Sequence, residues 1–254
     1  MGNESSASMM KTAMDLSKVD PSLLVHFVLG TSLAPALVPP IRKLVVSTGC
    51  YWGSEKSFWR LPGVVSTSVG SCGGGDEFKF PSYELVCSGA TGHAESVIVF
   101  YNSDVISFAD LMRQFLQSHD PSQRNGQGND HGTQYRSAVF LDDEEEVKFA
   151  RLAIAEYERL LKRKIHTQVV HPQPPFYYAE EYMQQYLAKP GSRPYCSAQP
   201  QGVSLVWGDW SKASLIQPKL PEAFWDKHSP IKGCVLREPN EQIVWPPSPP
   251  TSKQ

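Results

Sequence analysis

Apolar positions along the chain predict alternating strands and helices from residue 42 onward. Short runs rich in β-branched residues predict strands at Lys43–Ser47, Val64–Val69, Glu95–Tyr101, Ser137–Leu141 and Thr167–His171. Longer segments with an apolar face predict helices at Tyr51–Arg60, Ser107–Gln117, Asp142–Lys164 and Ala179–Leu187. This order predicts an α+β fold, a two-layer sandwich in which helices pack on one mixed sheet.

The length, charge and cysteine content bound the class of protein. A chain of 254 residues suits one compact domain with extensions. A net charge of −2 gives no broad positive field for phosphate backbones, so we expect no nucleic-acid partner. We also expect a monomer. Five cysteines, an odd number scattered along the chain, do not suit the disulfide framework of a small secreted domain. A reducing compartment with chemically active thiols fits better.

The first residues bear on where the protein resides. Leu23–Leu37 is apolar, but a histidine, a glycine and a proline interrupt it, so it is too short and broken for a transmembrane segment. The opening residues match the loose pattern for acylation at Gly2, and one acyl chain alone anchors a protein only marginally. We expect a cytoplasmic protein, with a lipid tether at Gly2 or import into an organelle left open.

The C-terminal part of the chain differs in composition from the middle. Tryptophans amid many prolines follow Val203: Trp207, Trp210, Trp225 and Trp245. This composition is typical of a wrapping or partly disordered arm rather than a second domain. We therefore expect an N-terminal extension over 1–41, a catalytic domain over 42–203 and a Pro/Trp-rich tail, mostly long coil, over 204–254.

Cys50 is the candidate nucleophile, because it lies where the first predicted strand ends and the first predicted helix begins. Unpaired backbone N–H groups and the helix dipole stabilise a thiolate at such a place, so the sequence predicts a lowered pKa for Cys50. Gly49 and Gly53 allow a tight turn and the close approach of a substrate. A lone cysteine is more often a small buried apolar residue, so its flanking sequence decides the interpretation.

Residues 49–53, Gly-Cys-Tyr-Trp-Gly, resemble the Gly-Cys-Phe-Trp-Gly signature of the A-class methionine sulfoxide reductases, the MsrA family. Further segments occur in the family's order and spacing: Trp59–Val64, Thr91–Glu95, His119–Pro121, Gly128–Ser137 and Phe176–Glu180. The resemblance implies a peptide-methionine (S)-S-oxide reductase with a ferredoxin-like core. Such an enzyme reduces methionine-S-sulfoxide, protein-bound or free, to methionine and so repairs oxidised proteins.

The resemblance also implies separate roles for the residues of the site. The thiolate of Cys50 attacks the sulfoxide sulfur, and the leaving oxygen must gain protons. The family's oxygen-binding groups fall on Tyr83, Glu95 and Tyr135. Glu95 is the expected proton donor, because burial keeps a carboxylic acid protonated.

Three further residues match groups that shape the family's site. Asp130 matches a polar residue that orders the site, and Tyr51 and Trp52 match the aromatic pair that receives the substrate methyl group. Taken singly, buried aromatic residues usually fill the core, and a glutamate on a strand can face solvent. The combination of these residues, rather than any one of them, supports the assignment.

Recycling requires a second thiol, because a sulfenic acid on Cys50 condenses readily with one. Cys196 matches the family's first recycling cysteine, and the resemblance implies a Cys50–Cys196 disulfide that thioredoxin reopens. Thioredoxin is thus the implied reductant, without a metal or a bound cofactor. Cys87 is frequent in the family without a recycling role, and we expect it to serve packing.

The sequence departs from the family in two places that concern thiols. Many members have a second recycling cysteine soon after the first, but residues 202–205 contain none. A two-cysteine relay is therefore expected, unless Cys234 in the tail replaces the missing thiol. The family's Gly-Tyr/Phe-Ala-Gly-Gly segment stands here as residues 70–74, Gly-Ser-Cys-Gly-Gly, which loses an aromatic residue and gains Cys72. The part of Cys72 in the relay therefore stays open.

Two alternatives of other classes remain at this point. A catalytically weak module that binds oxidised methionine would need no thiol, which disfavours it. A general disulfide oxidoreductase would need a Cys-x-x-Cys pair, which the sequence lacks.

Overall fold

The computed structural model describes residues 18–233 and 235–247. The strands of its main sheet are β1 (Ile41–Thr48), β2 (Val64–Cys72), β3 (Ala94–Asn102), β6 (Ser137–Phe140), β7 (Gln168–Val170) and β8 (Phe176–Tyr178). Two short strands, β4 (Gly126–Gln127) and β5 (Asp130–His131), form a separate pair. The α-helices are α2 (Tyr51–Trp59), α3 (Tyr83–Cys87), α4 (Phe108–Gln117), α5 (Glu144–Leu161) and α6 (Glu222–His228). None of the helices in this described part combines the length and apolar character needed to cross a bilayer.

The main sheet is mixed, as the sequence predicts. Its strand order is β7-β6-β1-β3-β2-β8, with β6 and β7 parallel and the other neighbours antiparallel. The central strands β1, β3 and β2 are long and almost fully buried. They provide a rigid support for the segments that follow them in the chain.

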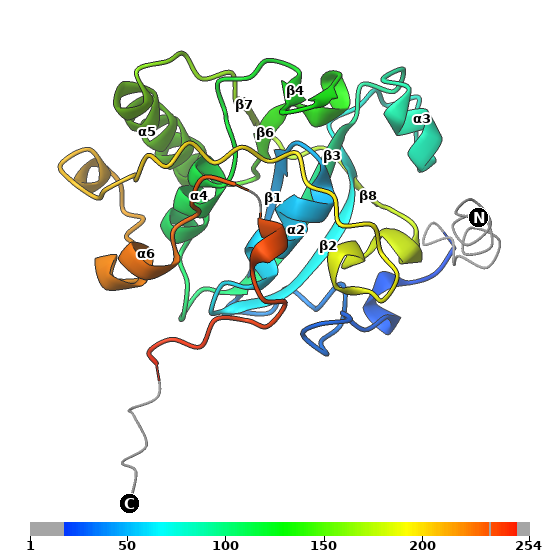
Figure 1. The fold of residues 1–254 in the computed structure, drawn as a ribbon, viewed down its shortest axis with the longest axis horizontal. Coiled ribbons are helices and arrows are strands. Elements are labelled where there is room, and N and C mark those ends of the chain that lie inside the picture. The colour runs from blue at the N-terminus through cyan, green and yellow to red at the C-terminus, as the bar shows by residue number, and fades with distance from the viewer. Residues whose placement is uncertain (1–17, 234, 248–254) are drawn as a thin grey trace, which may run out of the picture.

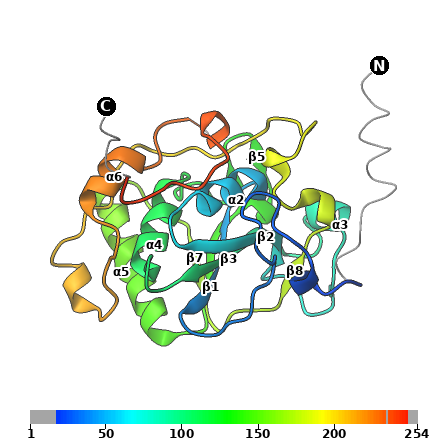
Figure 2. The same cartoon turned by 90° about the horizontal axis from the view of Figure 1, so that it is seen from below.

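The helices α2, α4 and α5 pack on one face of this sheet (Figures 1 and 2). The larger core lies between the sheet and these helices, where Leu44 and Val99 of the strands meet Phe58, Phe115 and other apolar side chains of the helices. A smaller core on the opposite face contains Val45 and Ile98 and is covered by coil and edge strands rather than by helices. The two-layer α+β sandwich is confirmed.

The helix predicted at Ala179–Leu187 is wrong. This stretch forms two short 3-10 turns, η3 (Glu181–Met183) and η4 (Tyr186–Ala188). Gln185 has a left-handed backbone with φ 47°, which ends any helix there. Side-chain bonds favour this break, because the amide of Gln184 bonds to Val69 of β2 and the amide of Gln185 bonds to the buried Glu55. Tertiary hydrogen bonds thus override the helical periodicity.

Strand β8 and helix α3 are among the elements that the apolar pattern does not predict. Strand β8 follows two prolines and consists of three consecutive aromatic residues, too few for a periodic signal. Helix α3 has only five residues and begins at Ser82, whose hydroxyl accepts from the backbone N–H of Leu85. Both elements lie at one end of the sheet, where they build a wall of the site described below.

The tail beyond Val203 wraps the helical face of the domain (Figure 2). Leu205, Phe224 and Trp225 from this tail are fully buried in the larger core or nearly so. Arg113 of α4 is 1% exposed, and its guanidinium carbon lies 4.8 Å from the ring centroid of Trp225. The same guanidinium donates to Glu222 at 2.7 Å, so the buried charge is compensated. The tail thus completes the core around α4.

Candidate active site

Cys50 is the residue that precedes α2, at the end of the tight turn after β1. Gly49 has a φ of +98°, which side chains disfavour, and a Cβ atom there would lie 2.6 Å from Gln127 Cβ. A Cβ atom at Gly53 would lie 2.6 Å from Cys196 Sγ. The two glycines therefore allow the backbone around Cys50 to approach its neighbours closely, and they place Cys196 beside the first turn of α2.

The predicted lowering of the Cys50 pKa is wrong for the structure as it stands. Backbone N–H groups of Trp52 and Gly53 do lower the pKa, as a helix start should. Burial of the thiol raises it more strongly, and the negative charges of Glu95 and Asp130 raise it further, so the net direction is upward. The resting cysteine is thus held as a neutral thiol.

Glu95 lies on β3 and is 3% exposed, beneath the start of α2. The backbone N–H of Tyr51, the residue after Cys50, donates to Glu95 Oε2 at 3.0 Å. This bond holds the Glu95 carboxyl at the start of α2. Burial raises the pKa of Glu95 to about 8, and the nearby Asp130 adds to this effect. The carboxyl is therefore largely protonated at neutral pH and able to give up a proton.

Tyr83 and Tyr135 bring their phenols to the same place from α3 and from the 3-10 turn η2 (Thr133–Tyr135). Burial raises the pKa of both phenols, and the charge of Glu95 contributes to each, so both are neutral hydrogen-bond donors. Both phenols lie close enough to Cys87 to lower the pKa of its thiol, against the raising effect of burial. Cys87 therefore contacts the predicted oxygen-binding groups, a closer relation to the site than packing alone.

Asp130 approaches the site from the short strand β5. The phenol of Tyr195 donates to Asp130 Oδ1 at 2.5 Å. The other carboxylate oxygen, Oδ2, is buried and has no hydrogen-bond partner among the described residues. Asp130 thus holds the chain just before Cys196 and keeps one oxygen available for another group.

Tyr51 and Trp52 occupy different positions around the site. Tyr51 is 3% exposed and packs into the larger core, with its hydroxyl unpaired among the described residues. Trp52 is partly exposed, and its indole stacks on Tyr186 with centroids 4.0 Å apart. Tyr195 meets the same indole edge-on at 6.3 Å. An aromatic cluster of Trp52, Tyr186 and Tyr195 is therefore available to an apolar group.

Tyr186 and Tyr195 are site residues that the sequence interpretation missed. Tyr186 lies within the segment wrongly predicted as a helix, where it is one of several apolar positions. Tyr195 immediately precedes Cys196, and this adjacency to a recycling cysteine is the signal that could have found it.

The thiols differ in state. Cys50, Cys72 and Cys87 are free, and Cys196 is disulfide-bonded. Cys72 is fully buried in the smaller core on the opposite face of the sheet, where burial raises the pKa of its thiol to about 12. Cys234 lies outside the described residues.

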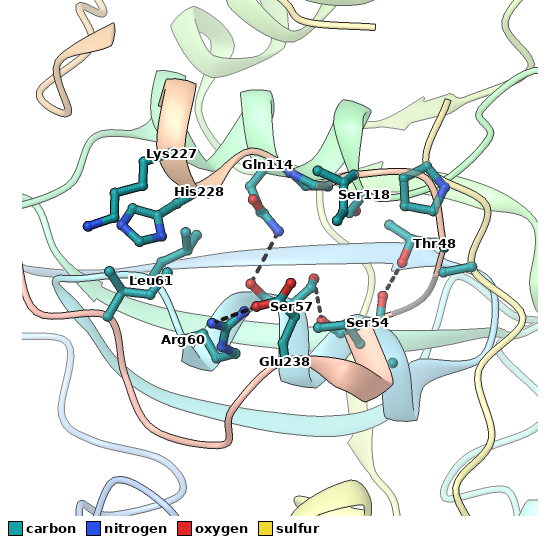
Figure 3. Close-up of a pocket in the computed structure, with 18 residues that line it drawn as sticks. Thr48, Ser54, Ser57, Arg60, Leu61, Gln114, Ser118, Lys227, His228 and Glu238 are labelled. Atoms are coloured by element: carbon teal, nitrogen blue, oxygen red, sulfur yellow. Dashed lines mark hydrogen bonds and ion pairs between the residues drawn. The ribbon is translucent and has the colours of Figure 1, made fainter. Parts of the chain in front are cut away.

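A second pocket lies between α2, α4 and the tail, and it contains none of the predicted site residues among the described residues that line it (Figure 3). The amide of Gln114 donates to the carbonyl oxygen of Ser57 at 3.2 Å, and Arg60 pairs with Glu238 at 3.1 Å along one wall of the pocket. Within the described part of the chain, no group of three or more side chains is arranged to ligate a metal ion.

Comparison with known proteins decides the family. The family model described as peptide methionine sulfoxide reductase matches residues 42–206. The chain belongs to this family. It is therefore a methionine sulfoxide reductase that depends on a thiol.

Named relatives agree over most of their length. A peptide methionine sulfoxide reductase MsrA of Xylella fastidiosa is 45% identical over 183 residues, which cover 70% of this chain and 83% of the relative. The solved methionine sulfoxide reductase A of Corynebacterium diphtheriae is 37% identical with a TM-score of 0.62, covering 70% of this chain and 87% of that one. Reduced Mxr1 of Saccharomyces cerevisiae is 34% identical with a TM-score of 0.59, covering 69% and 96%. The expected fold and family are confirmed.

Proposed function

We propose that Cys50 is the nucleophile and Glu95 the proton donor in the reduction of methionine-S-sulfoxide. One observation carries this assignment: the Glu95 carboxyl is buried, largely protonated and bonded to the backbone of the residue after Cys50. A neutral carboxyl in that place has a proton to give to an oxygen that leaves sulfur.

The proposed step transfers one oxygen atom. The sulfur of Cys50 attacks the sulfoxide sulfur while Glu95 protonates the oxygen, and the oxygen finishes on Cys50 as a sulfenic acid. The proton of the Cys50 thiol restores Glu95. Methionine sulfur gains two electrons and Cys50 sulfur loses two, so no other reactant is needed in this step.

The surrounding residues would bind the two ends of the sulfoxide group. The neutral phenols of Tyr83 and Tyr135 would donate to the sulfoxide oxygen, since burial keeps them protonated. Trp52, with Tyr51 beside it in the chain, would receive the methyl group, because it presents apolar surface next to Cys50. Asp130 would order the site through its bond to Tyr195.

For recycling we propose that Cys196 resolves the Cys50 sulfenic acid and that thioredoxin reduces the resulting disulfide, with no cofactor bound by the enzyme itself. Cys196 lies beside Gly53, in the first turn of the helix that Cys50 precedes. Its disulfide-bonded state does not involve Cys50, Cys72 or Cys87, which are free. Cys196 can act as a resolving thiol only after this disulfide is reduced.

We further propose that both protein-bound and free methionine sulfoxide are substrates, that residues 42–203 are the catalytic domain, and that the enzyme acts as a monomer. The free thiols Cys50, Cys72 and Cys87 suit the reducing conditions of the cytoplasm. A tether at Gly2 remains compatible with this placement, because the acylation pattern lies far from the site in sequence.

The decisive experiment supplies each epimer of a blocked methionine sulfoxide separately, with dithiothreitol as reductant, and measures methionine formed. Reduction of the S epimer alone by the wild type, and none by Cys50→Ser, is expected. Binding of the S epimer without turnover by the wild type would instead identify the weak binding module. Reduction of the R epimer at a similar rate would contradict the class assignment.

A further inference from the structure

A loop in the N-terminal extension, residues 24–33, contacts the segment that carries Tyr186 of the aromatic cluster (Figure 1). This N-terminal loop closes on itself, because the N–H of Leu33 donates to the carbonyl oxygen of Leu24 at 2.9 Å. The N–H of Phe27 donates to the side-chain oxygen of Gln185 at 3.1 Å. The loop precedes residue 42, where the match to the family begins. It is therefore an addition of this chain that reaches a segment of the catalytic domain.

His26 is the buried centre of the N-terminal loop and is 0% exposed. Its Nδ1 accepts the N–H groups of Val28 and Leu29, both at 3.1 Å, so Nε2 carries the proton and donates to Thr67 Oγ1 at 2.9 Å. Burial lowers the pKa of His26 to about 3, which keeps the ring neutral. The hydroxyl of Thr67 in turn donates to Glu55 Oε1 at 3.0 Å. A directed chain of hydrogen bonds thus runs from the loop through β2 to helix α2.

Glu55 receives this chain and passes it on to Gln185. The carboxyl is fully buried on α2, four residues after Tyr51. It accepts the backbone N–H of Gln185 at 2.8 Å and the side-chain amide of Gln185 at 2.7 Å. The φ of 47° at Gln185 is a left-handed conformation, which a residue with a side chain keeps only where its surroundings hold it. Loss of these bonds would let the backbone of Gln185 leave this conformation.

Tyr186 follows Gln185 directly, and its ring stacks on the indole of Trp52 with centroids 4.0 Å apart. Trp52 lies on α2, the helix that also carries Glu55. One helix thus holds both sides of this contact, because Glu55 fixes the backbone before Tyr186 and Trp52 meets its ring. A change at Gln185 is transmitted to the stack across a single peptide unit.

We propose that His26, Thr67 and Glu55 are positioning residues through which the N-terminal loop sets the geometry of the Trp52–Tyr186 stack. The inference rests on the proposed function, in which Trp52 receives the methyl group of the sulfoxide. The three side chains are buried and act through Gln185 and Tyr186 rather than on the substrate. The loop therefore strengthens substrate binding and leaves the chemical step unchanged.

The test measures single-turnover reduction of a blocked methionine-S-sulfoxide by the full-length chain, reduced beforehand and freed of reductant, over a range of excess substrate concentrations. The half-saturation concentration reports binding, and the rate at saturation reports the chemical step. The half-saturation concentration does not depend on the fraction of enzyme that is active, so partial unfolding of a variant does not imitate the effect.

Two substitutions interrupt the chain of hydrogen bonds. Thr67→Val removes the hydroxyl that connects the loop to α2 at nearly constant shape, and Glu55→Gln replaces one of the acceptor oxygens that face Gln185. Thr31→Val is the matched control. It removes another hydroxyl bond from the loop to β2, to the carbonyl oxygen of Val65 at 2.6 Å, which does not lead to Gln185.

We expect Thr67→Val and Glu55→Gln to raise the half-saturation concentration by roughly 3- to 10-fold, as for the loss of an aromatic contact, with the saturating rate within about twofold of the wild type. Thr31→Val should bind substrate as the wild type does. In a Tyr186→Ala background, Thr67→Val and Glu55→Gln should have no further effect, because the ring on which they act is absent.

An increase of equal size in the Tyr186→Ala background, or in Thr31→Val, would overturn the inference and assign the hydrogen bonds to general stability. An unchanged half-saturation concentration in Thr67→Val would likewise overturn it, whatever Glu55→Gln does. Failure of the wild type to reduce the blocked sulfoxide, or its reduction by Cys50→Ser, would instead refute the proposed function.

Discussion

The indole of Trp52 and the ring of Tyr186 stack with centroids 4.0 Å apart and planes inclined by 17°. This contact connects the helix that follows Cys50 to a turn more than a hundred residues later in the chain. If the stack forms the methyl-binding surface, Tyr186→Ala should lower kcat/KM for methionine sulfoxide by roughly 2- to 10-fold, as expected for an aromatic contact of about 0.5–1.5 kcal/mol.

Tyr186→Phe is the matched control, because it keeps the ring and removes only the hydroxyl. Steady-state kinetics with a blocked methionine-S-sulfoxide should show it within about twofold of the wild type. A loss in Tyr186→Phe equal to that in Tyr186→Ala would show that the hydroxyl, which accepts from the N–H of Arg193, is what matters.

Glu95→Gln should slow sulfoxide reduction by about 10²- to 10⁴-fold, the usual contribution of a positioned general acid. Alkylation of Cys50 by iodoacetamide should not slow, because the carboxylate of Glu95 raises the pKa of the Cys50 thiol rather than lowering it. Single-turnover reduction and alkylation rates, measured on the same samples, separate the two effects. Equal losses in both would assign Glu95 to the architecture of the helix start.

The raised pKa of Glu95 also predicts how stability depends on pH. The folded carboxyl has a pKa of about 8 against an ordinary value of 4.5, so between these values the native state binds more protons than the unfolded state. Stability contributed by this group is therefore complete below about pH 4.5 and declines as the pH rises toward 8. Urea denaturation across this range should show a shallower decline for Glu95→Gln than for the wild type.

The relay predicts a separation between first turnover and recycling. Cys196→Ser should still reduce one equivalent of sulfoxide per protein, because the first step needs Cys50 alone, but thioredoxin-driven turnover should collapse. If Cys234 is a further thiol of the relay, Cys234→Ser should also lose thioredoxin-driven turnover while keeping the first equivalent.

Cys72→Ser is the control for these variants, since Cys72 lies on the opposite face of the sheet. Peptide mapping of disulfides after one equivalent of substrate, together with coupled turnover, checks each case. A dominant Cys50–Cys72 disulfide would refute this relay. Full thioredoxin-driven activity of Cys234→Ser would show that Cys50 and Cys196 suffice.

The buried part of the tail should contribute strongly to stability. Trp225 is 0% exposed and stacks against the buried guanidinium of Arg113, so Trp225→Ala should cost about 3–5 kcal/mol of unfolding free energy. Leu215→Ala, at a side chain that is 88% exposed in the same tail, should change it by less than about 0.5 kcal/mol. Chemical denaturation of both variants measures the difference, and similar small effects would mean that the tail is not part of the cooperative fold.

The apolar pattern was sufficient for the parts of the fold that depend on local periodicity. Strands such as Glu95–Tyr101 and the helix at Ser107–Gln117 lie within a few residues of β3 and α4. The pattern failed at Gln184 and Gln185, because their amides bond to β2 and to Glu55, partners more than a hundred residues away in sequence. No window of sequence contains both ends of such a bond.

The pKa values of the site were also harder to predict from the sequence than the positions of its residues. The position of Cys50 before a helix was predictable from its neighbours, and so was the presence of a carboxyl at Glu95. The direction of the Cys50 pKa was not, because it depends on how deeply the thiol is buried and on how close Glu95 and Asp130 lie to it. These are properties of packing, which the helix-dipole argument does not include.

The contribution of the tail to the core has a consequence for synthesis. Arg113 and the apolar face of α4 are made early, whereas Phe224 and Trp225, which cover them, are made more than a hundred residues later. During translation the nascent chain therefore presents an incompletely covered helix and an unscreened guanidinium until synthesis has passed residue 225. A ribosome that stops near residue 203 would release a chain with every proposed catalytic residue but with an unfinished hydrophobic face, open to chaperones and to aggregation.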